Sequence, residues 1–177
     1  DHHEDALTVR ETELAMLRRL GVSEENLLDT QSNLASTYAN LGRNEEALSI
    51  ERDVYSGFLK LHGEEDERTF QAALNYAASL RGLRRFKEVK ALMRIKIPVA
   101  RRVLGERHRI TLKTRWAYAQ SLYYNAGATL DDLNEAVTTL EDTGRIARRV
   151  LGGAHPTTGD IENDLRKVRA ARDALQK

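Results

Sequence analysis

The eleven residues "RRVLGERHRIT", from Arg101 to Thr111, occur a second time in nearly the same form as "RRVLGGAHPTT", from Arg148 to Thr158. Both copies place a glycine directly after an apolar Val-Leu pair. Because glycine adopts the left-handed backbone conformation without a Cβ clash, a glycine at the end of an apolar run is typical of a helix C-terminus. The repeated stretch therefore indicates the end of one helix and the start of the next.

This stretch is part of a longer repeat. A weaker copy, "KLHGEEDERT", places Gly63 42 residues before Gly105, and Gly21 lies another 42 residues earlier. The intervening segments match at the same shift: "NLASTYANLG" at 33–42, "NYAASLRGLR" at 75–84 and "AYAQSLYYNA" at 117–126. The last spacing is 47 residues because of an insertion near "NAGATLDDLN" at 125–134. Self-similarity at a fixed period of this length predicts a solenoid.

Each period contains two helical patterns. In the first, Leu34, Ala35, Tyr38 and Leu41 fall on one face at helical spacing. No stretch has the alternating pattern of a strand, so the sequence predicts an all-α fold. The expected helices lie near 3–20, 24–41, 44–61, 66–82, 86–104, 108–125, 131–151 and 157–176.

The ends of these helices also have recognisable residues. We expect Ser23, Asp66 and Thr157 to cap helix N-termini, because their side-chain oxygens can accept from the first free N–H groups. Helix C-termini are predicted at four glycines: Gly21, Gly63, Gly105 and Gly152.

Pro98 interrupts one of the helical patterns, since proline removes a backbone donor and clashes with the preceding turn. The apolar residues Leu92, Ile95, Val99 and Val103 continue through it. We therefore predict a kink near Lys96 and an unbroken helix.

The phrases "NLASTYANLGRNEEAL", "LGERHRIT" and "LGGAHPTT" resemble tetratricopeptide repeats of the long-period kind found in kinesin light chains. The pattern is N-L-A-x-x-Y-x-x-x-G-[KR]-x-x-E-A followed by L-G-x-x-H-P-x-T. The second repeat departs from it, with Arg84 and Val89 where the family prefers Gly and Ala, and the third has Ala117 in place of the Asn. The resemblance covers nearly the whole chain and is specific for the fold, but it is weak for function.

The resemblance implies a right-handed α-solenoid of antiparallel helix pairs, with about seven or eight helices and a concave groove that binds peptides or partner domains. The expected division of the single array 1–177 is a half repeat 1–22, repeats 23–64 and 65–106, a repeat with the insertion at 107–153, and a C-terminal helix at 154–177.

Projecting the family pattern onto the chain places a set of side chains on the groove side. They are Asn33, Ser36, Asn40, Gln71, Asn75, Arg81, Lys113, Trp116, Gln120, Tyr123 and Tyr124.

The third repeat contributes the most distinctive part of this surface. Lys113, Trp116, Gln120 and Tyr123 follow one another at helical spacing, while Leu112, Tyr118, Ala119 and Leu122 supply a separate core stripe. An aromatic and basic stripe that the core does not need is typical of a peptide anchor. The alternative is that Trp116 packs against the neighbouring helix, and Asn33 and Asn75 likewise either pair with a ligand or bridge adjacent helices.

The charge distribution is uneven. Residues 1–80 contain 7 basic and 16 acidic side chains, a net charge of −9, whereas residues 81–115 contain 13 and 2, a net charge of +11. Basic residues near the groove favour an acidic partner, and those on second helices are expected to form a solvated outer face. The basic segment also leaves open an alternative function, the binding of nucleic acid or an anionic surface.

No catalytic or cofactor-binding pattern is present. The chain lacks cysteine, H-E-x-x-H and a glycine-rich phosphate loop, and it has no apolar stretch long enough to span a membrane. We therefore expect no enzyme activity, no cofactor and no metal. The leading prediction is a cytoplasmic protein–protein interaction scaffold that binds a peptide. The alternatives left open are a structural block and a homo-oligomer formed through exposed array ends.

Overall fold

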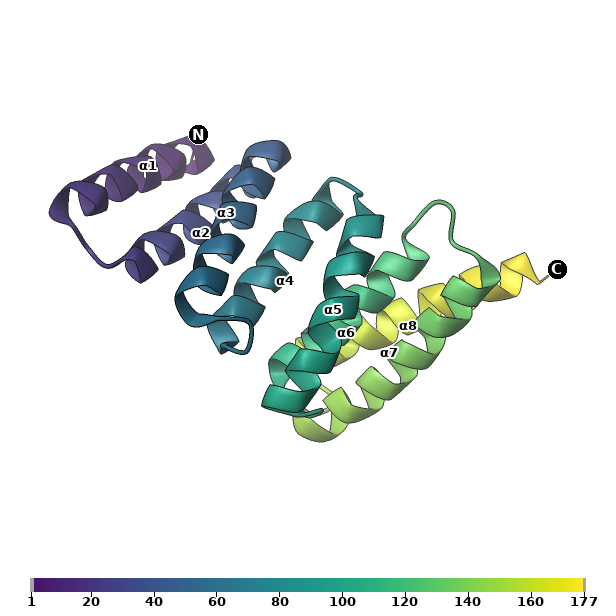
Figure 1. The fold of residues 1–177 in the computed structure, drawn as a ribbon. Coiled ribbons are helices and arrows are strands. Elements are labelled where there is room, and N and C mark those ends of the chain that lie inside the picture. The colour runs from purple at the N-terminus through teal and green to yellow at the C-terminus, as the bar shows by residue number, and fades with distance from the viewer. Residues whose placement is uncertain (1, 177) are drawn as a thin grey trace. The chain divides into compact units, whose positions relative to one another are not determined.

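The computed structural model describes residues 2–176, except for the side chains of His2, His3 and Ala6. In this part of the chain it contains eight α-helices and no strand (Figure 1). The prediction of an all-α fold is confirmed, and each helix begins and ends within two residues of the expected position. The helices are α1 (His2–Leu20), α2 (Glu24–Asn40), α3 (Asn44–His62), α4 (Glu67–Gly82), α5 (Phe86–Leu104), α6 (Arg109–Tyr123), α7 (Leu130–Val150) and α8 (Pro156–Leu175).

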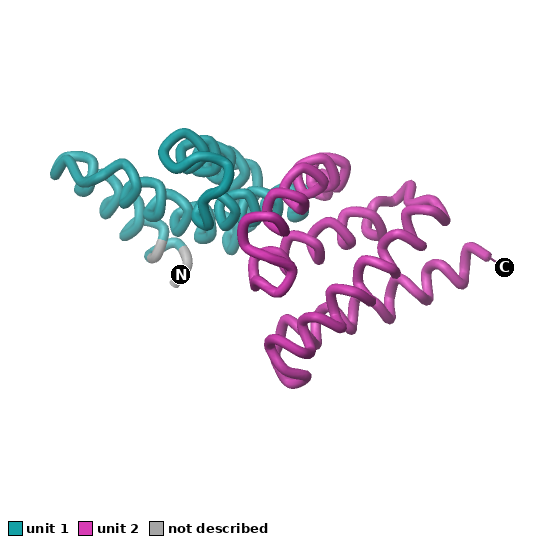
Figure 2. The backbone as a smooth tube through the Cα atoms, turned by 60° about the horizontal axis from the view of Figure 1, so that its bottom comes forward, with its two compact units in different colours: residues 1–83 teal, residues 84–177 magenta. Residues whose placement is uncertain are grey.

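The helices group into two compact units, residues 1–83 and residues 84–177 (Figure 2). In the first unit α1 packs on α2, α2 on α3 and α3 on α4, and α2 also touches α4. In the second unit α5, α6, α7 and α8 pack in the same consecutive order, and α6 also touches α8. Contacts between chain neighbours, and between alternate first helices, are the pattern of a helical solenoid. The finer division into numbered repeats stays a prediction.

The glycines predicted at helix ends all have a left-handed backbone. The φ angles are 64° at Gly21, 82° at Gly63, 87° at Gly105 and 93° at Gly152. The loop between α2 and α3 also contains a glycine with a positive φ angle, Gly42, at 76°. Its equivalent one period later is Arg84, which adopts a φ of 58° although it carries a Cβ atom.

Two of the three predicted N-caps are confirmed, and the third is wrong. Ser23 accepts from the Asn26 N–H, and Asp66 accepts from the Arg68 N–H. Helix α8, however, begins at Pro156, and its cap is His155, whose Nδ1 accepts from the Thr157 N–H at 3.1 Å. Proline is suited to the first turn of a helix because its missing N–H would have no partner there, so the helix starts before Thr157.

In both copies of the repeated stretch the histidine caps the N-terminus of the following helix. His108 caps α6, with its Nδ1 accepting from the Ile110 N–H at 3.3 Å. The threonine at the end of the stretch is buried, and the Thr111 hydroxyl donates to the Ala100 carbonyl at 3.3 Å. Thr69 makes the equivalent bond to Phe58 at 3.2 Å. Thr69 and Thr111 each join the first turn of a helix to the preceding helix.

Helix α5 continues through Pro98 without a break, as predicted. The apolar face predicted for it is wrong, because the side chain of Ile95 is 61% exposed. The buried face instead comprises Val89, Met93, Lys96 and Ala100. Pro98 lies on the exposed side, where the carbonyl that loses its helical partner can be hydrated. The kink at Lys96 stays a prediction.

Candidate peptide-binding site

A chain of hydrogen bonds crosses three helices of the first unit. The Gln71 amide donates to Asn75 Oδ1 at 2.9 Å within α4, and the Asn75 amide donates to Ser32 Oγ on α2 at 3.0 Å. Ser32 in turn donates to Glu51 Oε1 on α3 at 2.9 Å. These side chains therefore fix the relative positions of α2, α3 and α4.

Glu51 is the unusual member of this chain, because its side chain is only 3% exposed. Its second carboxyl oxygen, Oε2, is buried without a hydrogen-bond partner. Burial raises the pKa of Glu51 to about 7, although the hydrogen bond from Ser32 acts in the opposite direction. The buried carboxyl group of Glu51 therefore changes charge near neutral pH.

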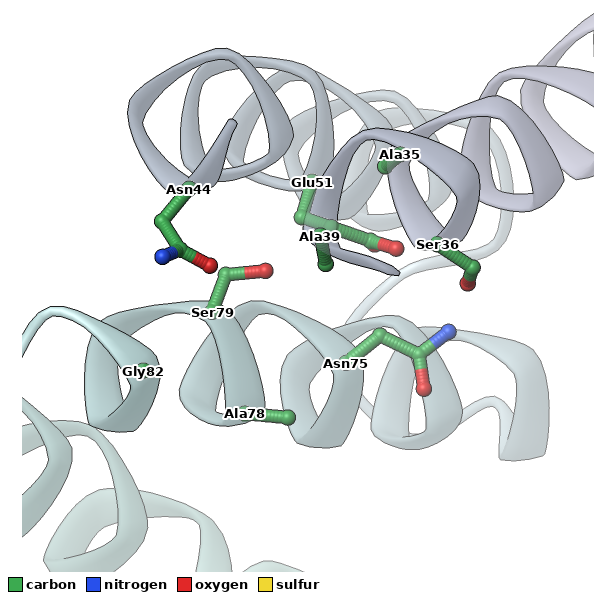
Figure 3. Close-up of a pocket in the computed structure, with 9 residues that line it drawn as sticks. All are labelled: Ala35, Ser36, Ala39, Asn44, Glu51, Asn75, Ala78, Ser79 and Gly82. Atoms are coloured by element: carbon green, nitrogen blue, oxygen red, sulfur yellow. The ribbon is translucent and has the colours of Figure 1, made fainter. Parts of the chain in front are cut away.

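Glu51 lines a cavity of about 220 Å³ between α2, α3 and α4 (Figure 3). In the close-up, its side chain extends from α3 into the space between α2 and α4, past Ala39 and toward Ser36. The lining residues are Ala35, Ser36, Ala39, Asn44, Glu51, Asn75, Ala78, Ser79 and Gly82.

Of the groove residues predicted in the first unit, some line a cavity and others lie exposed outside it. Ser36 and Asn75 line the cavity, and Gln71 lines an adjoining one of about 90 Å³ that also includes Asn75. The Asn75 amide bridges adjacent helices, which was one of the two expectations for it. The residues Asn33, Asn40 and Arg81 are exposed and do not line either cavity.

In the second unit, Asp164 of α8 organises much of the predicted aromatic stripe. Its side chain is buried and accepts from Trp116 Nε1 and Gln120 Nε2, each at 2.8 Å, and from Lys167 Nζ at 3.2 Å. Burial alone would raise the pKa of Asp164, but the hydrogen bonds from Gln120, Trp116 and their neighbours outweigh it and lower that pKa. The carboxylate is therefore the charged centre that joins α6 to α8.

Tyr123 of the stripe and its chain neighbour Tyr124 lie beside this centre. Their ring centroids are 4.2 Å apart. The Tyr123 hydroxyl is buried, and that burial raises its pKa above the usual range, whereas Tyr124 is 39% exposed. Gln120 is buried, so its amide is used inside the protein. A ligand can thus reach Lys113 and Trp116 of the stripe and the adjacent Tyr124 ring, and the role of these side chains in binding stays a prediction.

Four of the basic residues after Arg84 form ion pairs with carboxylates of the same unit. Arg85 pairs with Glu88 at 2.6 Å, and Lys90 pairs with Asp132 at 2.7 Å. The hydrogen bond from Lys90 lowers the pKa of Asp132 to about 2. Glu106 forms ion pairs with both Arg101 and Arg115. The positive charge of this segment is therefore less available to an anionic partner than its composition indicates.

Sequence reasoning missed Glu51 and Asp164, the two acids on which these clusters depend. Glu51 lies at helical spacing between Ala47, Val54 and Phe58, all of which are buried. A charged residue on that face was the available signal. Asp164 gave a similar signal between Ile161 and Val168, which are also buried.

Among the side chains that the structure describes, which exclude those of His2 and His3, no group of three or more His, Asp or Glu residues could hold a metal ion. In the same part of the chain, no helix is both long enough and apolar enough to cross a membrane.

Comparisons with known proteins relate part of the sequence, and the fold, to one class of repeat protein. Residues 27–67 match the family model described as tetratricopeptide repeat. This segment includes most of α2, all of α3 and the Glu51 carboxyl group. A search of the curated proteins found no match.

Solved structures of kinesin light chain-like proteins have the same fold. A putative kinesin light chain with nearly identical TPR-like repeats from Podosopora anserina is 20% identical, with a TM-score of 0.77 over 98% of this chain and 81% of that one. A point variant of that protein gives 20% identity and a TM-score of 0.79 over 98% and 80%. BtubC (BKLC) from P. vanneervenii is 14% identical, with a TM-score of 0.63 over 98% and 75%. The predicted resemblance to kinesin light chain-like tetratricopeptide repeats is thus confirmed for the fold.

Proposed function

We propose that this protein is a non-catalytic interaction scaffold that acts in the cytoplasm and binds an extended segment of a partner protein. The observation that carries the proposal is the tetratricopeptide repeat match at residues 27–67 within an eight-helix chain of the same fold. Solenoids of this kind use their extended surfaces for binding.

The reachable part of the second unit's stripe supplies a specific contact surface. Trp116 and Tyr124 offer aromatic area at low entropic cost, and Lys113, one turn before Trp116, adds positive charge. This combination supports a partner segment that presents an acidic residue next to an aromatic one. The indole of Trp116 is already oriented by Asp164, so its position does not depend on the ligand.

Selection from a random peptide library displayed on phage tests this proposal, followed by fluorescence anisotropy with a labelled peptide. We expect the selected peptides to lose at least tenfold in affinity with Lys113→Glu. The matched control is Lys87→Glu, since Lys87 is an exposed lysine on α5 outside the stripe. Equal binding by both variants, or no peptide enriched above an empty surface, would rule out the proposed surface.

The alternative, binding of nucleic acid through residues 81–115, has less support. Lys90, Arg101 and Arg115 are each engaged by carboxylates. Phosphate binding by these three residues would have to compete with the carboxylates, which lowers the gain from counterion release.

A further inference from the structure

The cavity between α2, α3 and α4 contains a buried acid with one unpaired oxygen, Glu51 Oε2. We propose that this cavity binds the side-chain ammonium group of a lysine in the partner segment, with Glu51 as its counter-charge. The inference deepens the proposed function and rests on it only for the source of the lysine.

Nearly all buried polar atoms in folded proteins have a hydrogen-bond partner, and a buried carboxylate without one is costly. Ser32 satisfies Oε1, and Asn75 and Gln71 hold Ser32 in place. The relay therefore fixes the carboxyl group and leaves Oε2 buried and unpaired, on a side chain that lines a cavity of about 220 Å³.

The number of open oxygens favours lysine over arginine. A guanidinium group binds best as a planar fork against both oxygens of a carboxylate, and Oε1 of Glu51 already accepts a hydrogen bond from Ser32. An ammonium group is compact and needs only one carboxylate oxygen. Three other oxygen-bearing side chains, Ser36, Asn44 and Ser79, line the same cavity and are the candidate acceptors for its remaining protons (Figure 3).

The walls suit the apolar stem of a lysine. Ala35 and Ala39 from α2 and Ala78 from α4 present methyl groups to the cavity. Lysine commonly buries its methylene chain against such surface. The first unit also carries a net charge of −8, from 8 basic and 16 acidic residues, which attracts a cation.

The charged surroundings of Glu51 allow a pH test. Glu51 is the titratable residue among the nine that line the cavity. On the facing helices, Asp29 of α2 and Arg68 of α4 line the adjoining cavity, and Arg81 of α4 precedes the lining residue Gly82. Binding of an ammonium group requires the ionised form of Glu51, whose pKa is about 7. Affinity should therefore rise about tenfold from pH 6 to pH 8.

The experiment is a titration of the full chain with n-butylamine, followed by the NMR signals of the Asn75 side-chain amide and the Ser79 backbone amide. We expect saturable shifts that require about tenfold less amine at pH 8 than at pH 6. Glu51→Gln should weaken binding at least tenfold, and Ala78→Leu should do so by filling the cavity. The control Glu45→Gln removes an exposed carboxylate from the same helix and should bind as the wild type does.

Three results would overturn the assignment: equal shifts with neutral n-butanol, unchanged binding by Glu51→Gln, or affinity that is the same at both pH values. A second arm separates a lysine side chain from a free amine. The peptide acetyl-Gly-Gly-Lys-Gly-Gly-amide should bind more tightly than spermidine, and its Nε-acetylated form should not bind. Tighter binding of spermidine than of the lysine peptide would indicate that the ligand is a small polyamine and not a lysine of a partner protein. Because these probes do not use the stripe on α6, failure here leaves the peptide-library result interpretable.

Discussion

Arg84 adopts a left-handed backbone conformation that glycine occupies at the equivalent position one period earlier, Gly42. A side chain with a Cβ atom is strained by about 1 kcal/mol or more in that conformation. Replacing Arg84 with glycine removes the strain but makes the unfolded chain more flexible, which offsets part of the gain. We expect Arg84→Gly to raise the free energy of unfolding by about 0.5 kcal/mol, measured by urea denaturation.

The reciprocal change provides the control for that prediction. Gly42→Ala introduces a Cβ atom at a φ of 76° and should lower the free energy of unfolding by about 1 kcal/mol. No neighbouring atom lies within 4 Å of the added Cβ, so the loss would come from the backbone alone. Opposite signs for the two variants are the expected outcome, and two losses of similar size would contradict it.

Glu51 predicts a distinctive dependence of stability on pH. Its pKa is about 7 in the folded chain and 4.5 ordinarily, so folding takes up a proton between these values. The contribution of Glu51 to the stability of the folded chain is fully present below pH 4.5 and is lost as the pH rises through the folded-state pKa of about 7. The stability of Glu51→Gln relative to wild type should therefore increase by about 3 kcal/mol from pH 4.5 to pH 8.

Urea denaturation of both proteins at several pH values measures that difference, and Glu45→Gln shows how much an exposed carboxylate contributes. A difference that stays constant with pH would mean that the pKa of Glu51 is the same in the folded and unfolded chains.

At the scale of elements, the helix caps can be tested separately from the residues beside them. His155 satisfies a free N–H at the start of α8, whereas Thr157, the residue expected to do so, lies inside the helix. We expect His155→Ala to cost about 1 kcal/mol and Thr157→Ala less than about 0.5 kcal/mol, in thermal or urea unfolding. A larger loss from Thr157→Ala would restore the original assignment of the cap.

The attachment of α8 to α6 depends on the Asp164 carboxylate, which accepts from Trp116, Gln120 and Lys167. Asp164→Asn should lower the free energy of unfolding by about 2 kcal/mol, because it leaves buried donors without a charged acceptor. Trp116 is the chain's single tryptophan, so its fluorescence reports the change directly. Asp160→Asn, an exposed change on the same helix, is the control.

The same carboxylate has a predictable response to acid. Its pKa is below the ordinary value of 3.8, so its stabilising contribution is present above that pH and is lost as the pH falls through the lower, folded-state pKa. The difference between wild type and Asp164→Asn should accordingly shrink in acid.

At the scale of the whole molecule, opposite charges are carried by the two units. Residues 1–83 have a net charge of −8, and residues 84–177 have a net charge of +9. Since ion pairs engage several of the basic residues, we expect a 15-nucleotide single-stranded DNA to bind with a Kd weaker than about 10⁻⁴ M at 150 mM salt. Micromolar binding that weakens steeply with added salt, measured by anisotropy, would instead favour the nucleic-acid alternative.

The sequence by itself determined the eight helices, their order and most of their ends. These features are local: apolar residues recur at helical spacing, and glycines follow the last turns, so neighbours in the chain suffice to specify them. It also identified the aromatic and basic stripe of α6, because that spacing lies within one helix.

Only the tertiary structure decided which of those side chains a ligand can reach. Gln120 and Tyr123 share the stripe with Trp116, yet Asp164, 44 residues beyond Gln120, turns the Gln120 amide inward. Glu51 likewise became a candidate site only where Ser32 and Asn75 meet it from two other helices. Burial and hydrogen bonding of this kind depend on residues far apart in the chain, so a pattern read along one helix does not contain them.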